Sequence, residues 1–213
     1  GHAPVLADSS VRAALNIAVD KNSIINSVLG GYGAALSGPI PPGVLQYFKP
    51  SGPDEQISES DRASMARDIL SKGGWKYDEK NRAWMKKKQT LSISLATSDS
   101  QELTATTNKI AEFWRAAGIN VNVKIYPISE LNLNIIRPRA YDAIFFGEVV
   151  GRSLDLFAFW HSSQRNDPGL NLALYANTKT DTLLAKARAE TSRSSREELY
   201  SSFASIIVKE QPA

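Results

Sequence analysis

The sequence contains no cysteine and only two histidines, His2 and His161. Without cysteine, disulfide bonds, thiolate metal sites and cysteine nucleophiles are all excluded. A transition-metal site needs three or four well-placed ligands. A single internal histidine and scattered acidic residues do not indicate such a site. We therefore expect neither a bound metal nor another cofactor.

Long apolar runs are missing as well. Ala143–Phe146 is typical of the longest, far below the roughly 18 residues that a membrane-spanning helix needs. The N-terminus shows no charged segment followed by an apolar one, so we expect no signal peptide in this chain. Gly1-His2 resembles a cloning remnant. Residues 1–8 are accordingly predicted to be a tag or linker remnant, and residues 9–213 a single domain.

The composition is typical of a globular protein. Of the 213 residues, 42% are hydrophobic and 22% are charged, which favours a packed core over disorder. The net charge of +3 is too small to indicate nucleic-acid binding. The lysine run Lys86–Lys88 is predicted to be a solvated turn before a strand, with an anionic partner as the alternative.

The middle of the chain predicts alternating strands and helices. Apolar and polar residues alternate over 91–96 and 120–126, which predicts two strands. The apolar residues 143–146 predict a third, short strand that is buried on both faces. Between the first two strands, Asp99 and Glu102 are expected to cap a helix that ends at Gly118. This order implies right-handed crossovers and a mostly parallel sheet flanked by helices, which is an α/β fold.

Further elements are predicted on either side of this sheet. A helix is expected to begin at an N-cap of Ser9 or Ser10, and two helices occupy the C-terminal tail. Residues 75–84 predict a short hairpin with its turn at 78–81. The Pro- and Gly-rich stretch 32–53 predicts a long loop.

Catalysis has little support in this sequence. A Ser-His-Asp arrangement would have to use His161, and there is no Gly-x-Ser-x-Gly motif. A lone histidine that follows Phe159-Trp160 more often ends a helix or packs against neighbours. We expect that role for His161, and we do not expect an enzyme.

Binding has more support, because ligands of open parallel sheets lie beyond the carboxyl ends of the strands. The first strand leads into hydroxyls and a carboxylate suited to a polar solute, although N-capping is an equally open interpretation of Asp99. After the third strand, Gly147 and Gly151 either admit a ligand close to the backbone or serve a tight turn. The candidate ligand-binding residues are Ser98, Asp99, Ser100, Gly147, Glu148, Val149, Val150, Gly151 and Arg152.

Several stretches, taken in order, resemble one known family. Residues 11–25 are similar to "VRxALxxAIDRxxI", residues 38–43 to "GPIPPG", and residues 66–75 to "AkxLLxxAGW". Residues 175–187 resemble "YSNPEVDxLLxxA", and residues 196–212 resemble "RxxLYxxxQxIIxxxxP". These are the stretches of the family 5 extracellular solute-binding proteins, the peptide- and nickel-type receptors of ABC importers.

The resemblance implies a receptor of two lobes hinged around a cleft, with the type II periplasmic-binding-protein fold. Residues 9–213 match its C-terminal lobe, so the N-terminal lobe of the same protein would be a partner that is absent here. The other implied partners are a peptide or small polar solute and an ABC permease in the membrane, with no nucleic acid. A periplasmic or extracellular location is implied, with membrane association if the whole protein is a lipoprotein.

One departure from the family pattern concerns the ligand. Peptide-binding members continue as "GWxxDxxDP" after the third strand, and that first Asp pairs with the α-amino group of the ligand. Here Glu148 stands at the Trp position and Gly151 at the Asp position. Either Glu148 substitutes for the missing carboxylate, or the ligand is not a peptide with a free amine. The alternative function is a stand-alone interaction module that docks a membrane partner.

Overall fold

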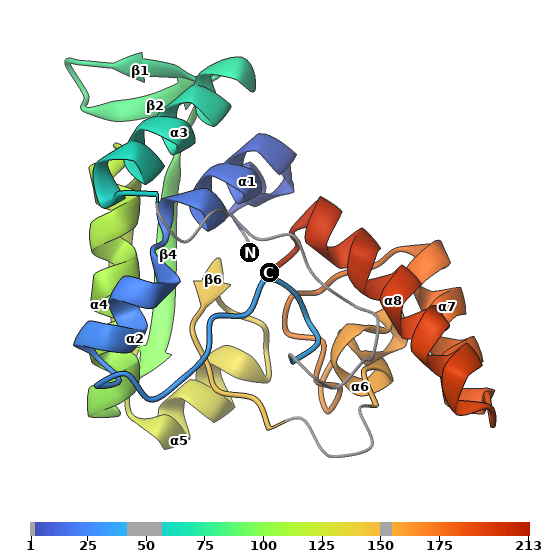
Figure 1. Ribbon diagram of the computed structural model, residues 1–213. Coiled ribbons are helices and arrows are strands. Elements are labelled where there is room, and N and C mark those ends of the chain that lie inside the picture. The colour runs from blue at the N-terminus through green and yellow to red at the C-terminus, as the bar shows by residue number, and fades with distance from the viewer. Residues whose placement is uncertain (1–2, 42–56, 150–154) are drawn as a thin grey trace. The chain divides into compact units, whose positions relative to one another are not determined.

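The computed structural model describes residues 3–41, 57–149 and 155–213 (Figure 1). The chain divides into two compact units. The first unit contains residues 1–35, 53–136 and 140–146, and the second contains 36–52, 137–139 and 147–213. Each unit has its own cluster of buried hydrophobic residues.

A parallel sheet lies at the centre of the first unit. Its strands are β4 (Ser92–Ser98), β5 (Asn120–Tyr126) and β6 (Ala143–Ile144), in the order β5-β4-β6. Both β5 and β6 pair with β4 in parallel. Helix α4 (Gln101–Ala116) connects β4 to β5, and α5 (Ile128–Glu130) with a π-helical turn (Leu131–Ile136) leads to β6. The predicted α/β class with a parallel sheet is confirmed.

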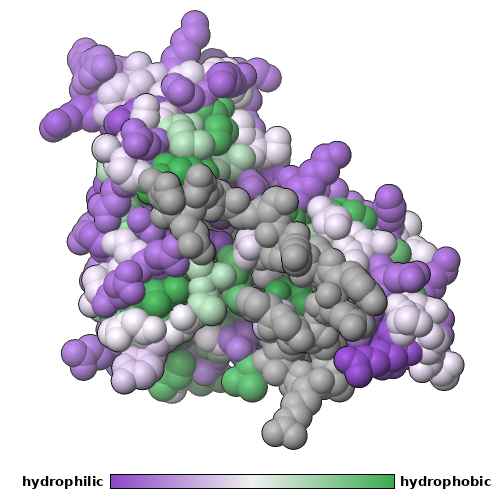
Figure 2. Space-filling view, in the orientation of Figure 1, coloured by the Kyte–Doolittle hydropathy of each residue, from purple (hydrophilic) through white to green (hydrophobic). Residues whose placement is uncertain are grey.

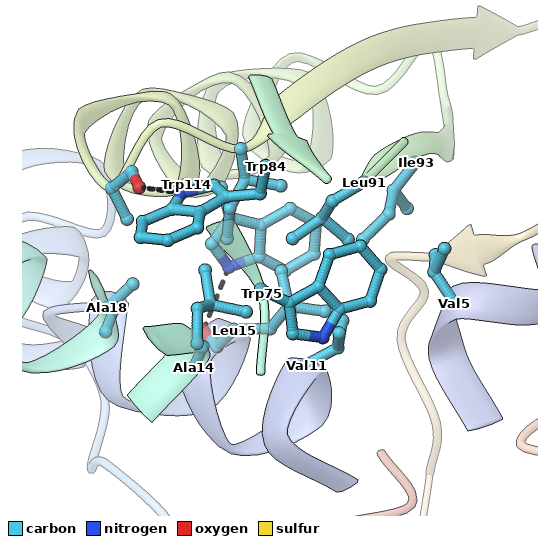
Figure 3. Packing of buried hydrophobic residues seen from close by; sticks show 14 of the residues in the cluster. Val5, Val11, Ala14, Leu15, Ala18, Trp75, Trp84, Leu91, Ile93 and Trp114 are labelled. Carbon is cyan, nitrogen blue, oxygen red and sulfur yellow. Dashed lines mark hydrogen bonds between the residues drawn. The ribbon is translucent and has the colours of Figure 1, made fainter. Parts of the chain in front are cut away.

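Three tryptophans fill the core of the first unit, and each indole N–H has an acceptor (Figure 3). Trp84 donates to the carbonyl of Ala117 and Trp114 to that of Leu15, both at 2.9 Å. Trp75 donates to the Asp8 carboxylate at 3.2 Å. Because a buried indole N–H without a partner would be costly, these bonds let the large rings pack in one arrangement.

The N-terminal part of the first unit is helical. Its elements are a 3-10 turn (Pro4–Ala7), α1 (Ser9–Ala18), α2 (Lys21–Ser27) and α3 (Glu59–Lys72). The predicted N-cap at Ser9 or Ser10 is wrong, because the Asp8 carboxylate accepts from the backbone N–H of Ser10 at 2.9 Å. In the stretch predicted to be a tag or linker remnant, Val5 is buried in the core and Asp8 is this cap.

A small antiparallel sheet completes the first unit. It contains β1 (Lys76–Asp78), β2 (Ala83–Lys86) and β3 (Gln89–Thr90), so the predicted hairpin is confirmed. Lys87 and Lys88 form the solvated turn between β2 and β3, as expected. Lys86 does not belong to that turn: its ammonium group binds the Asp8 carboxylate at 2.6 Å.

The second unit is helical. It contains α6 (Phe157–Trp160), a 3-10 turn (Ser162–Gln164), α7 (Thr178–Ala189) and α8 (Arg193–Glu210), so the two predicted tail helices are confirmed. Its buried cluster includes Leu184, Phe203 and Ile207, together with Ile40 from the predicted long loop. Most of that loop lies outside the described residues. In the part of the chain that the structure describes, every helix is too short or too polar to span a bilayer.

Candidate ligand-binding site

The carboxyl ends of β4 and β5 lie level with each other. Ser98 is paired in register with Tyr126, and the next backbone N–H, that of Asp99, donates to the Tyr126 carbonyl at 2.9 Å. Ser98 is buried, and its hydroxyl accepts from the N–H of Ser100 at 3.4 Å. The side chains of Asp99 and Ser100 are exposed. At this edge, therefore, Asp99 and Ser100 face solvent, whereas Ser98 supports the turn.

Helix α4 begins without a side-chain cap. Ser100 occupies the N-cap position, and no side-chain hydrogen bond is made there. The prediction that Asp99 and Glu102 form a cap is therefore wrong. The reason is geometric: the Asp99 backbone continues the ladder to Tyr126, which displaces the helix start by one residue. The Asp99 carboxylate consequently does not serve the first turn of α4.

A surface pocket of about 710 Å³ adjoins this edge within the first unit. It lies between the C-terminal end of α2 and the first turn of α4, and Tyr32 is 88% exposed beside it. Its lining is polar on the α4 side, with Ser100, Gln101 and Glu102. Sequence reasoning missed the α2 side, where the helix ends at Ser27 with Val28 as its C-cap and Gly30-Gly31 follows. The residues lining the pocket are Ser27, Val28, Leu29, Tyr32, Ser100, Gln101, Glu102 and Ala105.

The candidate residues that follow β6 belong to the second unit. Gly147, Glu148 and Val149 are exposed, and Val149 keeps 92% of its surface. A methyl group added at Gly147 would meet nothing within 4 Å, so no close approach of protein atoms requires a glycine there. Although Glu148 is exposed, nearby protein atoms partly desolvate its carboxyl and raise its pKa. Val150, Gly151 and Arg152 lie outside the described residues.

Asp142, which directly precedes β6, has a structural role in this chain. The Asp142 carboxylate accepts from the backbone N–H of Ser94 at 3.0 Å and from its hydroxyl at 2.7 Å. Thr97 donates its hydroxyl to the carbonyl of Phe145 at 3.0 Å. These bonds fix the register of β6 against β4, because β6 itself is only two residues long.

His161 ends α6 and caps the turn that follows, as its position predicted. Its Nδ1 accepts from the backbone N–H of Ser163 at 3.1 Å, and its ring stacks on Phe157 with centroids 4.0 Å apart. The neighbouring Asp181 carboxylate accepts from the backbone N–H and hydroxyl of Ser162. Within residues 3–41, 57–149 and 155–213, no group of three or more His, Cys, Asp or Glu side chains is placed to hold a metal ion.

Comparison with known proteins identifies the class. Residues 1–170 match the model of the bacterial extracellular solute-binding proteins, family 5 Middle. The chain belongs to this family, and its fold is that of the type II periplasmic binding proteins.

Particular relatives are similar along nearly the whole chain. The oligopeptide-binding protein AppA of Bacillus subtilis is 28% identical over 207 residues, which are 96% of this chain and 37% of AppA. The structure of AppA with a nonapeptide has a TM-score of 0.86 at 26% identity, covering 98% of this chain and 41% of that one. NikZ of Campylobacter jejuni, solved with Ni(L-His), shares the fold, with a TM-score of 0.79 at 23% identity over 98% of this chain and 41% of its own. This chain thus spans well under half the length of these relatives.

Proposed function

We propose that the protein captures a peptide or a related small polar solute for an ABC importer, and that this chain is the C-terminal lobe of the receptor. The match of residues 1–170 to the solute-binding family carries the proposal. The similarity to AppA, an oligopeptide-binding protein, supports a peptide as the solute. The other lobe would close over the ligand and exclude water from it. The location is periplasmic or extracellular, with a lipid anchor on the whole protein as part of the same proposal.

In the first unit, we assign solute binding to the end of β4. Asp99 and Ser100 present a carboxylate and a hydroxyl to solvent beside the 710 Å³ pocket. Neither side chain is used to cap α4. A carboxylate at this place suits an amide N–H or a cationic group of a polar solute, since hydrogen bonds to charged groups are the stronger ones. Ser98 would act indirectly, through the turn that its hydroxyl supports.

In the second unit, we assign a separate contact to Glu148 within residues 147–152. Its exposed position leaves the carboxylate accessible to a ligand, and a bound cation would offset the desolvation that raises its pKa. Gly151 has no side chain to meet an α-amino group. The proposal is therefore that Glu148 supplies the negative charge for a cationic group of the ligand.

The decisive experiment identifies the solute in the full-length receptor. Native mass spectrometry of the purified protein should show a bound small molecule, and calorimetric titration then measures its Kd. Glu148→Gln and Asp99→Asn should each weaken binding about 10- to 150-fold, which is the loss of a charged hydrogen bond. Glu198→Gln, the same change at an exposed residue of α8, is the matched control and should leave Kd unchanged.

Two outcomes would contradict the assignment. If both variants bind the identified solute as tightly as the unmodified receptor, these residues are solvated turn residues. If the isolated chain binds the solute with micromolar affinity, the shared cleft is wrong. A single lobe makes only about half of the contacts, whereas the ligand still loses all of its translational and rotational freedom on binding. The affinity of the isolated chain should therefore be millimolar or weaker.

A further inference from the structure

A cationic hairpin surface covers the small antiparallel sheet of the first unit. We define it by five exposed side chains: Lys76, Lys80, Arg82, Lys87 and Lys88. Residues 75–90 contain six Lys and Arg against two acidic residues, a net charge of +4, whereas the other 197 residues together have a net charge of −1. The positive charge of the chain is therefore concentrated in one short segment.

The hairpin geometry places these cations in the exposed turns at both ends of β2 and on β1. Lys80 and Arg82 lie in the turn from β1 to β2, and Lys87 and Lys88 lie in the turn from β2 to β3, at the other end of β2. Lys76 pairs in register with Met85. Because side chains alternate along a strand, Lys76 points to the face opposite the buried Trp84. Figure 2 shows hydrophilic residues over this sheet, at the top of the view.

The acidic residues of the segment do not neutralise this surface. Asp78 accepts from the backbone N–H groups of Lys80 and Asn81, at 2.9 and 3.2 Å, and from the Asn81 side chain. Its carboxylate therefore shapes the turn. Glu79 is the other acidic residue among residues 75–90, so the five exposed cations exceed the acids by three. Lys86 is excluded from the surface because it is bound to Asp8.

The kind of cation indicates the partner. Four of the five side chains are lysines, and lysine is depleted in protein–protein interfaces, whereas arginine is enriched. Clusters of lysine attract anionic lipid surfaces without a fixed partner geometry. We propose that the cationic hairpin surface docks on a membrane that carries anionic phospholipid headgroups. Docking would keep the receptor close to the bilayer, and it does not depend on which solute the protein binds.

Vesicle binding by the 213-residue chain tests this proposal. Co-sedimentation with vesicles of phosphatidylglycerol and phosphatidylcholine should give clear binding at low salt, and vesicles of phosphatidylcholine alone should give none. Each lysine near such a surface contributes about fivefold to partitioning, so Lys87→Gln/Lys88→Gln should lower it about 25-fold. Binding should vanish at about 1 M salt, where the screening length falls to about 3 Å.

The control removes the same charge elsewhere. Lys179→Gln/Lys186→Gln neutralises two exposed lysines of α7 and should change partitioning less than about twofold. An unchanged urea midpoint in both double variants shows that each is folded. The proposal is overturned if the unmodified chain does not bind anionic vesicles, or if it binds both vesicle types equally. It is also overturned if the two double variants lower partitioning by the same factor. Binding of a DNA fragment under conditions where vesicles are not bound would overturn it in favour of a nucleic-acid surface.

Discussion

The Asp8 carboxylate joins parts of the first unit that are far apart in the sequence. It caps α1 through Ser10, and it accepts from the Lys86 ammonium group at 2.6 Å and from the Trp75 indole at 3.2 Å. Burial by itself raises the pKa of this carboxyl, but the hydrogen bonds from Lys86, Ser10 and Trp75 together lower it from 3.8 to about 2. The charged form of Asp8 therefore stabilises the fold.

The size of this contribution follows from the pKa. A fall from 3.8 to about 2 corresponds to about 2.5 kcal/mol, at about 1.4 kcal/mol per pH unit. Because the Asp8 side chain keeps 23% of its surface exposed and that of Lys86 keeps 32%, solvent screening reduces the expected value to about 2 kcal/mol. Asp8→Asn should lower the free energy of unfolding by that amount at pH 7, since asparagine still caps a helix but carries no charge.

The pH dependence has a definite sign. The folded-state pKa of Asp8 lies below its unfolded value, so the contribution is fully present above about pH 4 and is lost as the pH falls through about 2. Urea unfolding of the unmodified protein and of Asp8→Asn at pH 7, 4 and 2.5 measures the difference in their free energies of unfolding. At pH 2.5, about a third of the difference found at pH 7 should remain.

A matched variant separates the charge from the cap. Asp20 caps α2 by accepting from the backbone N–H of Ser23 at 2.9 Å. Asp20→Asn should therefore cost less than about 0.5 kcal/mol, because an asparagine cap is nearly equivalent. The reasoning is refuted if Asp8→Asn costs no more than Asp20→Asn, or if the difference between the unmodified protein and Asp8→Asn is as large at pH 2.5 as at pH 7.

Three further predictions concern stability. Asn171 is fully buried, and its side chain binds backbone groups of Trp160, His161 and Tyr175. Asn171→Leu should therefore lower the free energy of unfolding, measured in urea, by about 3 kcal/mol or more, and a decrease of less than about 1 kcal/mol would contradict this. Gly118 has a φ of +81°, and an added Cβ would lie 2.9 Å from a ring carbon of Tyr77, so Gly118→Ala should lower the unfolding free energy by about 2 kcal/mol rather than raise it. If the chain is a single lobe, calorimetry should show one cooperative transition, and two separated transitions would contradict the single-domain prediction.

The elements of the fold were largely predictable because their signals are local. Alternation over 120–126 and the apolar run at 143–146 both proved to contain parallel strands, and Gly118 does follow α4. The predicted burial of residues 143–146 on both faces is wrong, because β6 covers only Ala143–Ile144, both half-buried, and Phe146 is exposed. The helix caps were less predictable. Asp8, Ser9 and Ser10 are all good N-cap residues, and only the folded backbone decides which oxygen reaches the free N–H groups.

The candidate site was predictable only in part. The strand-end rule located Ser98–Ser100, but it did not distinguish the buried Ser98 from the exposed Asp99 and Ser100. That distinction depends on how the chain turns after β4, where the Asp99 backbone still pairs with Tyr126. The α2 side of the adjoining pocket comes from residues about 70 positions earlier in the chain, beyond the reach of any local pattern.

The sequence by itself determined the α/β class, the hairpin and the family, because periodicity, turn residues and ordered motifs are carried by neighbouring residues. The tertiary structure decided what the three lysines at 86–88 do. They are chemically identical, yet Lys86 binds Asp8, 78 positions away, while Lys87 and Lys88 remain in the exposed turn. The physical reason is that two charged residues so far apart in the sequence can form an ion pair only after the core has packed and brought their side chains together.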